Sequence, residues 1–182
     1  MLALNFTPFP ELKTGRLLLR KLETTDANEM FFLRSNENVL RYIGREPTKT
    51  ITEADEFINK INKAVDDNES ILWGIVFLSE PSTIIGTICL WNFKKEHYRG
   101  EIGYILHPDH WRKGIMKEAI NAVVDYGFTV LDLHSIEALL DPENIASSAV
   151  LESTGFIKEG HLKESIYFKG GFRDEAIYSR LK

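Results

Sequence analysis

Three apolar segments in the middle of the chain, followed by a long helix pattern, limit the possible folds more than any other feature. The segments are ILWGIVFL (71–78), TIIGTICLWNF (83–93) and GEIGYILH (100–107), all rich in β-branched and aromatic residues. SEPS and KKEHYRG separate them, which predicts three consecutive and mostly antiparallel strands. Apolar residues then recur at helical spacing from about 112 to 130. The centre of the chain therefore predicts a sheet followed by a helix that packs against it.

The flanking sequence extends this alternation of strands and helices. RLLLRKL (16–22) predicts a strand and TTDANEMFFLRSN (24–36) a helix. TEADEFINKINKAV (52–65) predicts a second helix, with Thr52 and Asp55 as a capping box. After the long helix, the predicted elements are a strand at 135–141, a short helix that ends at Gly155, and strands at 156–168 and 174–181.

This order predicts one mixed α/β domain over residues 14–182, preceded by an extended lead-in at 1–13. The chain has 182 residues and a formal net charge of -5, so a general basic face for nucleic acid is not expected. A single cysteine, Cys89, excludes a disulfide framework and indicates a reducing compartment. There is no long apolar run, no signal-peptide pattern and no metal-ligand spacing among the histidines. We therefore expect a cytoplasmic protein without membrane, nucleic-acid or metal binding.

The start of the long helix contains residues that helix physics disfavours at that position. Arg112, Lys113 and Lys117 place positive charge where the helix dipole favours negative charge. Gly114 lies among them, although glycine costs a helix about 1 kcal/mol relative to alanine. A bound phosphate explains both features, because free first-turn N–H groups hold its oxygens and glycine allows close approach. A solvated basic patch with an incidental glycine is the alternative. GxxxxGKS/T and GxGxxG are both absent.

The segment GEIGYILHPDHWRKGIMKEA resembles the acetyl-CoA-binding motif of the GCN5-related N-acetyltransferase (GNAT) superfamily. That motif is a strand and a proline followed by Gln/Arg-x-x-Gly-x-Gly/Ala, and here it spans Trp111 to Met116. Tryptophan at the first position is common in the branch similar to the ribosomal-protein acetyltransferases RimJ and RimL. TGRLLLRKLETTDANEMF, DPENIASSAVLESTGFIKEG and YFKGGFRDEAIYSRL resemble the opening, the NxxSxxxLxxxGF segment and the RimJ/RimL-type ending.

This resemblance covers nearly the whole chain and implies the GNAT fold. We therefore expect a mostly antiparallel mixed sheet of about six to seven strands, with a splayed central pair and about four helices. In this fold the strand before the phosphate-binding turn pairs with the pantetheine arm of acetyl-CoA. The cofactor-binding residues that the resemblance implies are Ile105, Leu106, His107, Arg112, Lys113, Gly114, Ile115, Met116, Lys117, Asn144 and Ser147. Met116 replaces a small residue, which requires its side chain to point away from the pyrophosphate.

The resemblance also implies catalytic residues. Glu101 matches the strand glutamate of GCN5-like histone acetyltransferases, so it is the candidate general base, acting directly or through a water. A structural carboxylate paired with Arg99 or a lysine is the alternative. Many superfamily members carry a tyrosine acid where this chain has Leu151. Ser147 is therefore the candidate to protonate or orient the leaving sulfur, as in RimL-like enzymes.

These assignments predict an acetyl-CoA-dependent N-acetyltransferase that acts on a primary amine. The acceptor is a protein N-terminal α-amine or a small molecule, such as a polyamine, an aminoglycoside or an amino-acid-like compound. A non-catalytic CoA-binding module is the remaining alternative. Acceptor selectivity is expected from the first two helices and the YFKGGF loop, with Arg34 and Arg41 as candidates to meet an acceptor carboxylate. The sequence does not fix the oligomeric state, for which a homodimer is one option.

Overall fold

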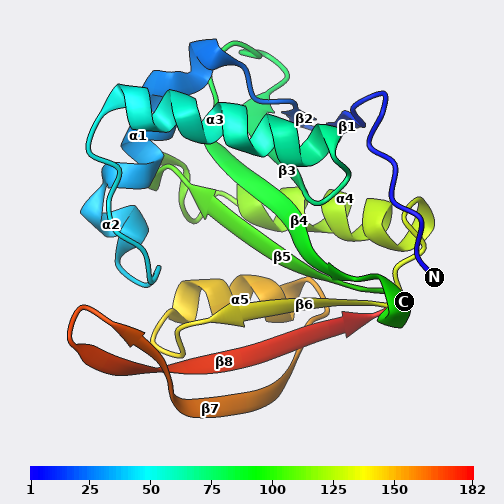
Figure 1. Cartoon of the computed structure of the whole chain (residues 1–182), viewed down its shortest axis with the longest axis vertical. Coiled ribbons are helices and arrows are strands. Elements are labelled where there is room, and N and C mark those ends of the chain that lie inside the picture. Colours follow the sequence, from blue (N-terminus) through cyan, green and yellow to red (C-terminus); the bar gives the residue numbers. More distant parts are fainter.

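The central sheet has the strand order β1-β2-β3-β4-β5-β6-β8-β7 in this computed structural model, which describes residues 1–182 (Figure 1). Neighbouring strands are antiparallel except β5 and β6, which are parallel. The strands are β1 (Leu12–Lys13), β2 (Leu17–Arg20), β3 (Ile71–Phe77), β4 (Gly86–Lys94), β5 (Arg99–Leu106), β6 (Ser135–Leu140), β7 (Ile157–Phe168) and β8 (Gly171–Leu181).

The predicted mixed, mostly antiparallel sheet is confirmed, but its eight strands exceed the expected six to seven. The additional strand is β1, whose two residues pair with β2. Leu2 and Phe6 lie near it in the sequence and are buried in the main core. The N-terminal segment therefore packs against the domain, and the boundary at residue 14 stays a prediction.

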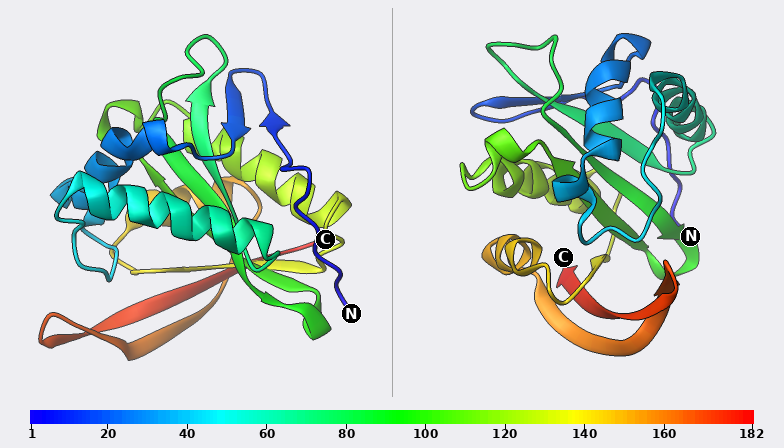
Figure 2. Two further views of the ribbon diagram at one scale, coloured as in Figure 1. Left: turned by 45° about the horizontal axis from the view of Figure 1, so that its top comes forward. Right: turned by 90° about the vertical axis from the view of Figure 1, so that its left-hand side faces the viewer.

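Helices cover both faces of the sheet (Figures 1 and 2). They are α1 (Ala27–Ser35), α2 (Glu37–Leu40), α3 (Ile51–Asp66), α4 (Ile115–Thr129) and α5 (Ile145–Ser153). Helices α1 to α3 lie on one face, and α4 and α5 lie on the other. None of the helices is long and apolar enough to cross a membrane.

The helices differ from the prediction in three places, because capping side chains and the local backbone conformation decide where a helix begins. The predicted helix at 24–36 ends within one residue of α1, but Asn36 then caps a separate four-residue helix, α2, that was not predicted and that brings the helix count to five. Helix α3 is capped by Thr50 and Glu53, not by Thr52 and Asp55. Helix α4 begins at Ile115, later than 112, because the preceding residue Gly114 has a left-handed backbone with φ of 73°.

Two apolar clusters hold these layers together. The larger cluster lies between the sheet and α4 and includes the fully buried Trp73, Ile88 and Val123. The smaller cluster lies between the sheet and α1 and α3, and its centre includes Met30 and Ile58. The sheet thus separates two apolar clusters, one packed on each of its faces.

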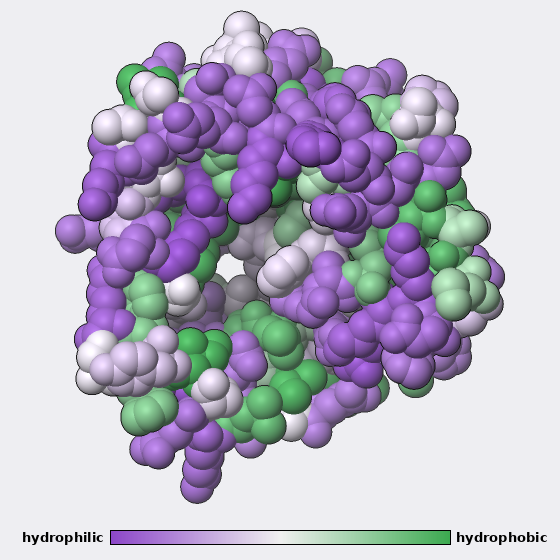
Figure 3. Space-filling model, in the orientation of Figure 1, coloured by the Kyte–Doolittle hydropathy of each residue, from purple (hydrophilic) through white to green (hydrophobic).

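The parallel pair β5 and β6 opens after a short contact. Its register pairs only Arg99 with Ser135, Gly100 with Ile136, and Glu101 with Glu137. Beyond Glu101 the two strands diverge, so the expected splayed pair is present. Figure 3 shows an opening through the molecule in this region. A gap between two strands leaves backbone N–H and C=O groups free to bind an extended ligand.

Candidate active site

Every second residue of β5 directs its backbone groups into the gap between β5 and β6. His107 N donates to Ile85 O at 2.8 Å, so these residues form a hydrogen-bonded pair of the β4–β5 ladder. The alternation of an antiparallel ladder then turns the backbone groups of Ile105 and His107 toward β4, and those of Tyr104 and Leu106 into the gap. Leu106 O already accepts a hydrogen bond from Trp111 Nε1 at 2.8 Å. The expected pantetheine contacts therefore move to the backbone of Tyr104 and the N–H of Leu106, and away from Ile105 and His107.

Glu101 is the last residue of β5 that pairs with β6, and the gap between these two strands begins after it. Its side chain is buried, and its carboxylate accepts a hydrogen bond from Asn92 Nδ2 at 3.1 Å. Burial raises the pKa of Glu101, and the bond from Asn92 opposes this effect. Arg99 and Lys94 both pair with Glu137, at 2.6 and 3.2 Å. The suggested structural pairing of Glu101 with Arg99 is therefore absent.

Tyr104 and Ser147 bring two hydroxyl groups together from β5 and α5. Ser147 Oγ donates to Tyr104 Oη at 3.1 Å. Burial raises the pKa of Tyr104 to about 12, although the bond from Ser147 opposes the shift, so the phenol stays protonated near neutral pH. Asn144 caps α5 and accepts a hydrogen bond from Ser147 N at 3.1 Å, which orients the first turn of this helix.

Tyr104 was not among the predicted site residues. Leu151, at the position of the family tyrosine, is fully buried in the main core and leaves no hydroxyl there. The available sequence signal was the position of Tyr104 in GEIGYILH, three residues after Glu101. In a strand this spacing places the two side chains on opposite faces, so Tyr104 reaches α5 while Glu101 faces the other side.

The turn between β5 and α4 has a backbone shaped to receive a ligand. Arg112 and Gly114 both have left-handed φ angles, of 61° and 73°. A Cβ atom added at Gly114 would meet only Arg16 Nη2, at 3.7 Å, so the space beside this glycine is open. The N–H groups of residues 115 to 117 begin α4 and have no intrahelical acceptor. This geometry is typical of an anion-binding helix start.

Arg16 joins this turn from the loop between β1 and β2, and sequence reasoning missed it. Its Nη1 donates to Lys113 O at 3.2 Å, and its Nη2 pairs with Glu118 at 2.8 Å. Burial raises the pKa of Glu118, but hydrogen bonds from Thr14 and Arg16 outweigh this effect and lower the pKa overall. The acidic residue thus fixes a cation beside Gly114 and joins α4 to the N-terminal strands.

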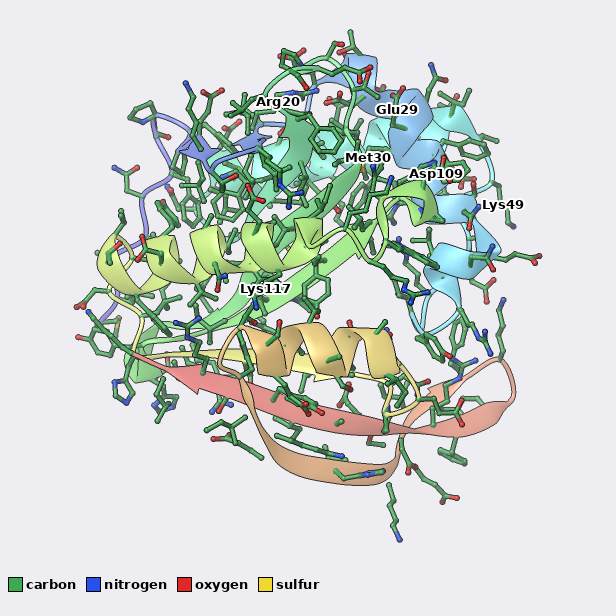
Figure 4. The ribbon with its side chains drawn as sticks, turned by 180° about the vertical axis from the view of Figure 1, so that it is seen from behind. Arg20, Glu29, Met30, Lys49, Asp109 and Lys117 are labelled. Carbon is green, nitrogen blue, oxygen red and sulfur yellow. The ribbon has the colours of Figure 1, made fainter.

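The side chains around the turn separate into buried and exposed groups. Ile115 and Met116 are buried in the main core, so Met116 points away from the open side of the turn. Arg112, Lys113 and Lys117 are exposed. Lys117 projects from α4 on the side that faces α5 (Figure 4). The open glycine, the free N–H groups and these cations fit the pyrophosphate of a CoA molecule.

His107 has a packing role in addition to its place on β5. Its ring stacks on Phe32 of α1, with 4.4 Å between the ring centres. Both residues line a surface hollow of about 370 Å³ between α1 and the β5–α4 turn, with Asp109 at its edge (Figure 4). A second hollow, of about 340 Å³, lies between α5 and β8. Neither hollow includes Glu101 or Tyr104.

No group of three or more histidine, cysteine, aspartate or glutamate side chains is arranged to hold a metal ion. Most of the predicted site residues fall into two groups. Asn144 and Ser147 lie on α5 beside Tyr104, and residues 112 to 117 form the turn at the start of α4. Glu101 is separated from both groups by the thickness of the sheet.

The chain is similar in sequence and fold to known proteins. A family model described as an acetyltransferase (GNAT) domain matches residues 16–157. The uncharacterized N-acetyltransferase YoaA of Bacillus subtilis is 38% identical over 174 residues, which is 96% of this chain and 98% of that protein. The crystal structure of spermidine N-acetyltransferase from Vibrio cholerae with CoA and spermine is 30% identical, with a TM-score of 0.80 and coverage of 92% and 96%.

A ribosomal-protein-S5-alanine acetyltransferase structure from Vibrio fischeri is also similar, at 26% identity, with a TM-score of 0.80 and coverage of 94% and 96%. The RimJ/RimL-like branch has support only at this greater distance, whereas the GNAT assignment rests on a match over most of the chain. GNAT domains use acetyl-CoA as their acetyl donor, and the turn at Gly114 fits that donor. The chain belongs to the GNAT family and is an N-acetyltransferase.

Proposed function

We propose that this enzyme moves the acetyl group of acetyl-CoA to a peptide or protein N-terminal α-amine in the gap between β5 and β6. The observation that carries the proposal is the placement of Glu101 and the Tyr104–Ser147 pair on opposite faces of β5, at the point where β6 diverges. One face then offers a proton acceptor and the other a proton donor.

Acetyl-CoA and the acceptor amine approach β5 from opposite faces of the sheet. Tyr104 packs against the main core, on the side of α4 and α5 where the anion-binding turn begins. Ile105 packs against the smaller cluster under α1 and α3, and Glu101 shares its face because strand side chains alternate. The donor therefore enters from the α4 and α5 side, and the acceptor from the side of α1 to α3.

Acetyl-CoA, when bound, supplies a thioester whose carbonyl carbon a neutral amine can attack. Residues 112 to 117 bind its pyrophosphate, and the backbone groups of Tyr104 and the N–H of Leu106 orient its pantetheine arm. Glu101 accepts a proton from the amine, directly or through a water. Tyr104 donates a proton to the leaving thiolate, and Ser147 orients the phenol. An α-amine, with a pKa of about 7.7–8.0, needs less help from Glu101 than a lysine of pKa about 10.4.

A polyamine is the second candidate acceptor. Glu137 and Glu175 raise the pKa of Glu101 through their charges, so three carboxylates lie near the acceptor side of the gap. Carboxylates of this kind attract polycations. The similarity to a spermidine acetyltransferase favours the same class. Lys94 and Arg99 neutralise Glu137, however, which weakens the attraction.

An acceptor screen tests the proposal. Release of free thiol from acetyl-CoA would be followed with short peptides, Nα-blocked lysine and spermidine, and the products located by mass spectrometry. We expect the highest kcat/KM with peptide α-amines. A clear preference for spermidine would replace this proposal with the second candidate. Binding of acetyl-CoA without amine-dependent thiol release would contradict both.

A further inference from the structure

Two arginines lie close together on the face covered by α1 to α3, and neither has an acidic partner. Arg34 ends α1, and its guanidinium carbon lies 3.5 Å from the ring centre of Phe57 on α3. Its Nε donates to Thr48 Oγ1 at 3.3 Å. Arg45 lies in the loop between α2 and α3. Thr48, three residues after Arg45 in this loop, also donates its N–H to Arg34 O at 2.9 Å, so the loop is fastened against Arg34.

The donors of Arg45 are not satisfied within the chain. Its Nε and Nη2 atoms are buried, and no atom of the protein accepts a hydrogen bond from them. Burial and the charge of Arg34 lower the pKa of Arg45 to about 10, and burial lowers the pKa of Arg34. The acidic residue next in sequence, Glu46, instead approaches Lys169 at 3.7 Å. Burying an unpaired charge costs folding free energy, and a ligand that accepts hydrogen bonds from Arg45 would offset this cost.

The pair is on the side of the sheet from which the acceptor approaches. Phe57, under Arg34, packs on the same apolar cluster as Ile105 of β5. Ile105 and Glu101 share one face of β5. Figure 1 shows α2 and the loop after it between the α1 and α3 layer and the β7–β8 hairpin. The contact between Glu46 and Lys169 joins this loop to the hairpin.

We infer that Arg34 and Arg45 bind a carboxylate of the acceptor, and that the substrate is an amine that also carries a negative charge. A guanidinium group presents paired donors that match the two oxygens of a carboxylate. The inference rests on the proposed function, because it assumes that the acceptor occupies this face. It narrows the acceptor to a peptide with an acidic residue near its N-terminus or to an amino-acid-like compound. A polycation such as spermidine would meet like charge at this point.

A melting experiment tests the anion site without catalysis. The whole chain is saturated with coenzyme A, which fills the turn at Gly114, and is melted in sodium malonate or sodium chloride at equal ionic strength. Malonate should raise the Tm of the wild type by about 2–4 °C. Arg45→Gln should lose this shift, and its Tm without malonate should not fall, because the substitution removes an unpaired charge.

Lys49→Gln is the matched control, because Lys49 is exposed in the same loop and carries the same charge (Figure 4). This variant should keep the full malonate shift. Equal malonate shifts in the wild type and Arg45→Gln, or no shift in the wild type, would overturn the inference. A shift with inorganic phosphate but none with malonate would overturn the assignment to a carboxylate.

A second measurement connects the pair to the acceptor. Two amidated tripeptides that differ only in aspartate or asparagine at the second position are compared as acceptors. We expect the wild type to favour the aspartate peptide by about tenfold in kcat/KM. In Arg45→Gln the ratio should approach one, whereas Lys49→Gln should keep the wild-type ratio. An unchanged ratio would contradict the inference. If neither peptide is acetylated while the malonate shift depends on Arg45, the proposed acceptor class fails and the anion site remains.

Discussion

Glu101 and Tyr104 lie three residues apart on β5, and their side chains face opposite sides of the sheet. The carboxylate is held by Asn92 of β4, and the phenol is held by Ser147 of α5. A single strand therefore separates a proton acceptor from a proton donor, so neither group neutralises the other. This separation makes the two roles independent, and each can be tested by itself.

Replacing Glu101 with glutamine should lower kcat while acetyl-CoA affinity stays nearly unchanged. A general base contributes about 10²–10⁴-fold to the rate. Burial raises the pKa of Glu101, so wild-type activity should fall as pH drops through a value above the usual range of a glutamate. The deficit of Glu101→Gln should shrink at high pH, where the free amine forms without help.

The measurement is kcat/KM against pH for the wild type, Glu101→Gln and the exposed control Glu159→Gln. The control should follow the wild type. Superimposed profiles for the wild type and Glu101→Gln would show that Glu101 is a structural carboxylate.

Removing the phenol should slow the departure of the thiolate. We expect Tyr104→Phe to lower kcat by about 10–10²-fold, below the upper range for a general acid, because a thiol with pKa near 8.5 is already a good leaving group. Ser147→Ala should have a smaller effect on kcat if Ser147 only orients Tyr104. Single-turnover rates and acetyl-CoA Kd values would separate the two. A change confined to acetyl-CoA Kd in both variants would remove the acid role from this pair.

A carboxylate placed at the open glycine should repel the pyrophosphate. Gly114→Glu should weaken acetyl-CoA binding by at least about tenfold, or about 1.4 kcal/mol. Gly114→Ala should also cost stability, because the left-handed φ of 73° strains any residue with a Cβ atom. Gly171→Ala is the control, because a Cβ atom there meets nothing within 4 Å and its φ is not left-handed. Unchanged calorimetric affinity in Gly114→Glu would contradict the phosphate assignment.

The bonds around Glu118 should make stability depend on pH. Its folded-state pKa is lowered, so its contribution is present above the unfolded pKa and is lost as pH falls through the folded pKa. Glu118→Gln should therefore lower the Tm at neutral pH by about 2–4 °C, for about 1 kcal/mol of hydrogen bonding. The difference should disappear below the folded-state pKa.

Asp132→Asn is a suitable comparison for this effect. Asp132 pairs with Lys182 on the surface and also has a lowered pKa, but exposed pairs contribute little to stability. Its Tm should change less than that of Glu118→Gln. Thermal melts across pH would give both results, and equal effects in the two variants would contradict a structural role for Glu118.

The sequence by itself predicted the order of the elements and the unusual turn at the start of the long helix, while the splayed strand pair was expected from the resemblance to the GNAT family. The order and the turn depend on local spacing: alternation of apolar residues in strands, helical periodicity after residue 112, and glycine among cations at a helix start. Local spacing was not sufficient to predict where every helix begins. The caps of α3 and the short helix α2 that begins after Asn36 were missed because several polar residues in each stretch can serve as caps, and packing selects among them.

Only the tertiary structure decided which distant residues meet. Arg16 reaches Gly114 because β2 passes beside the start of α4, and Tyr104 reaches Ser147 because α5 lies against the opened strand. Strand register turned the backbone of His107 toward β4, although its sequence position suggested a ligand contact. Arg45 was left without a partner by the same packing. Register and layer packing arise from contacts between segments far apart in the chain, and spacing within one segment does not encode them.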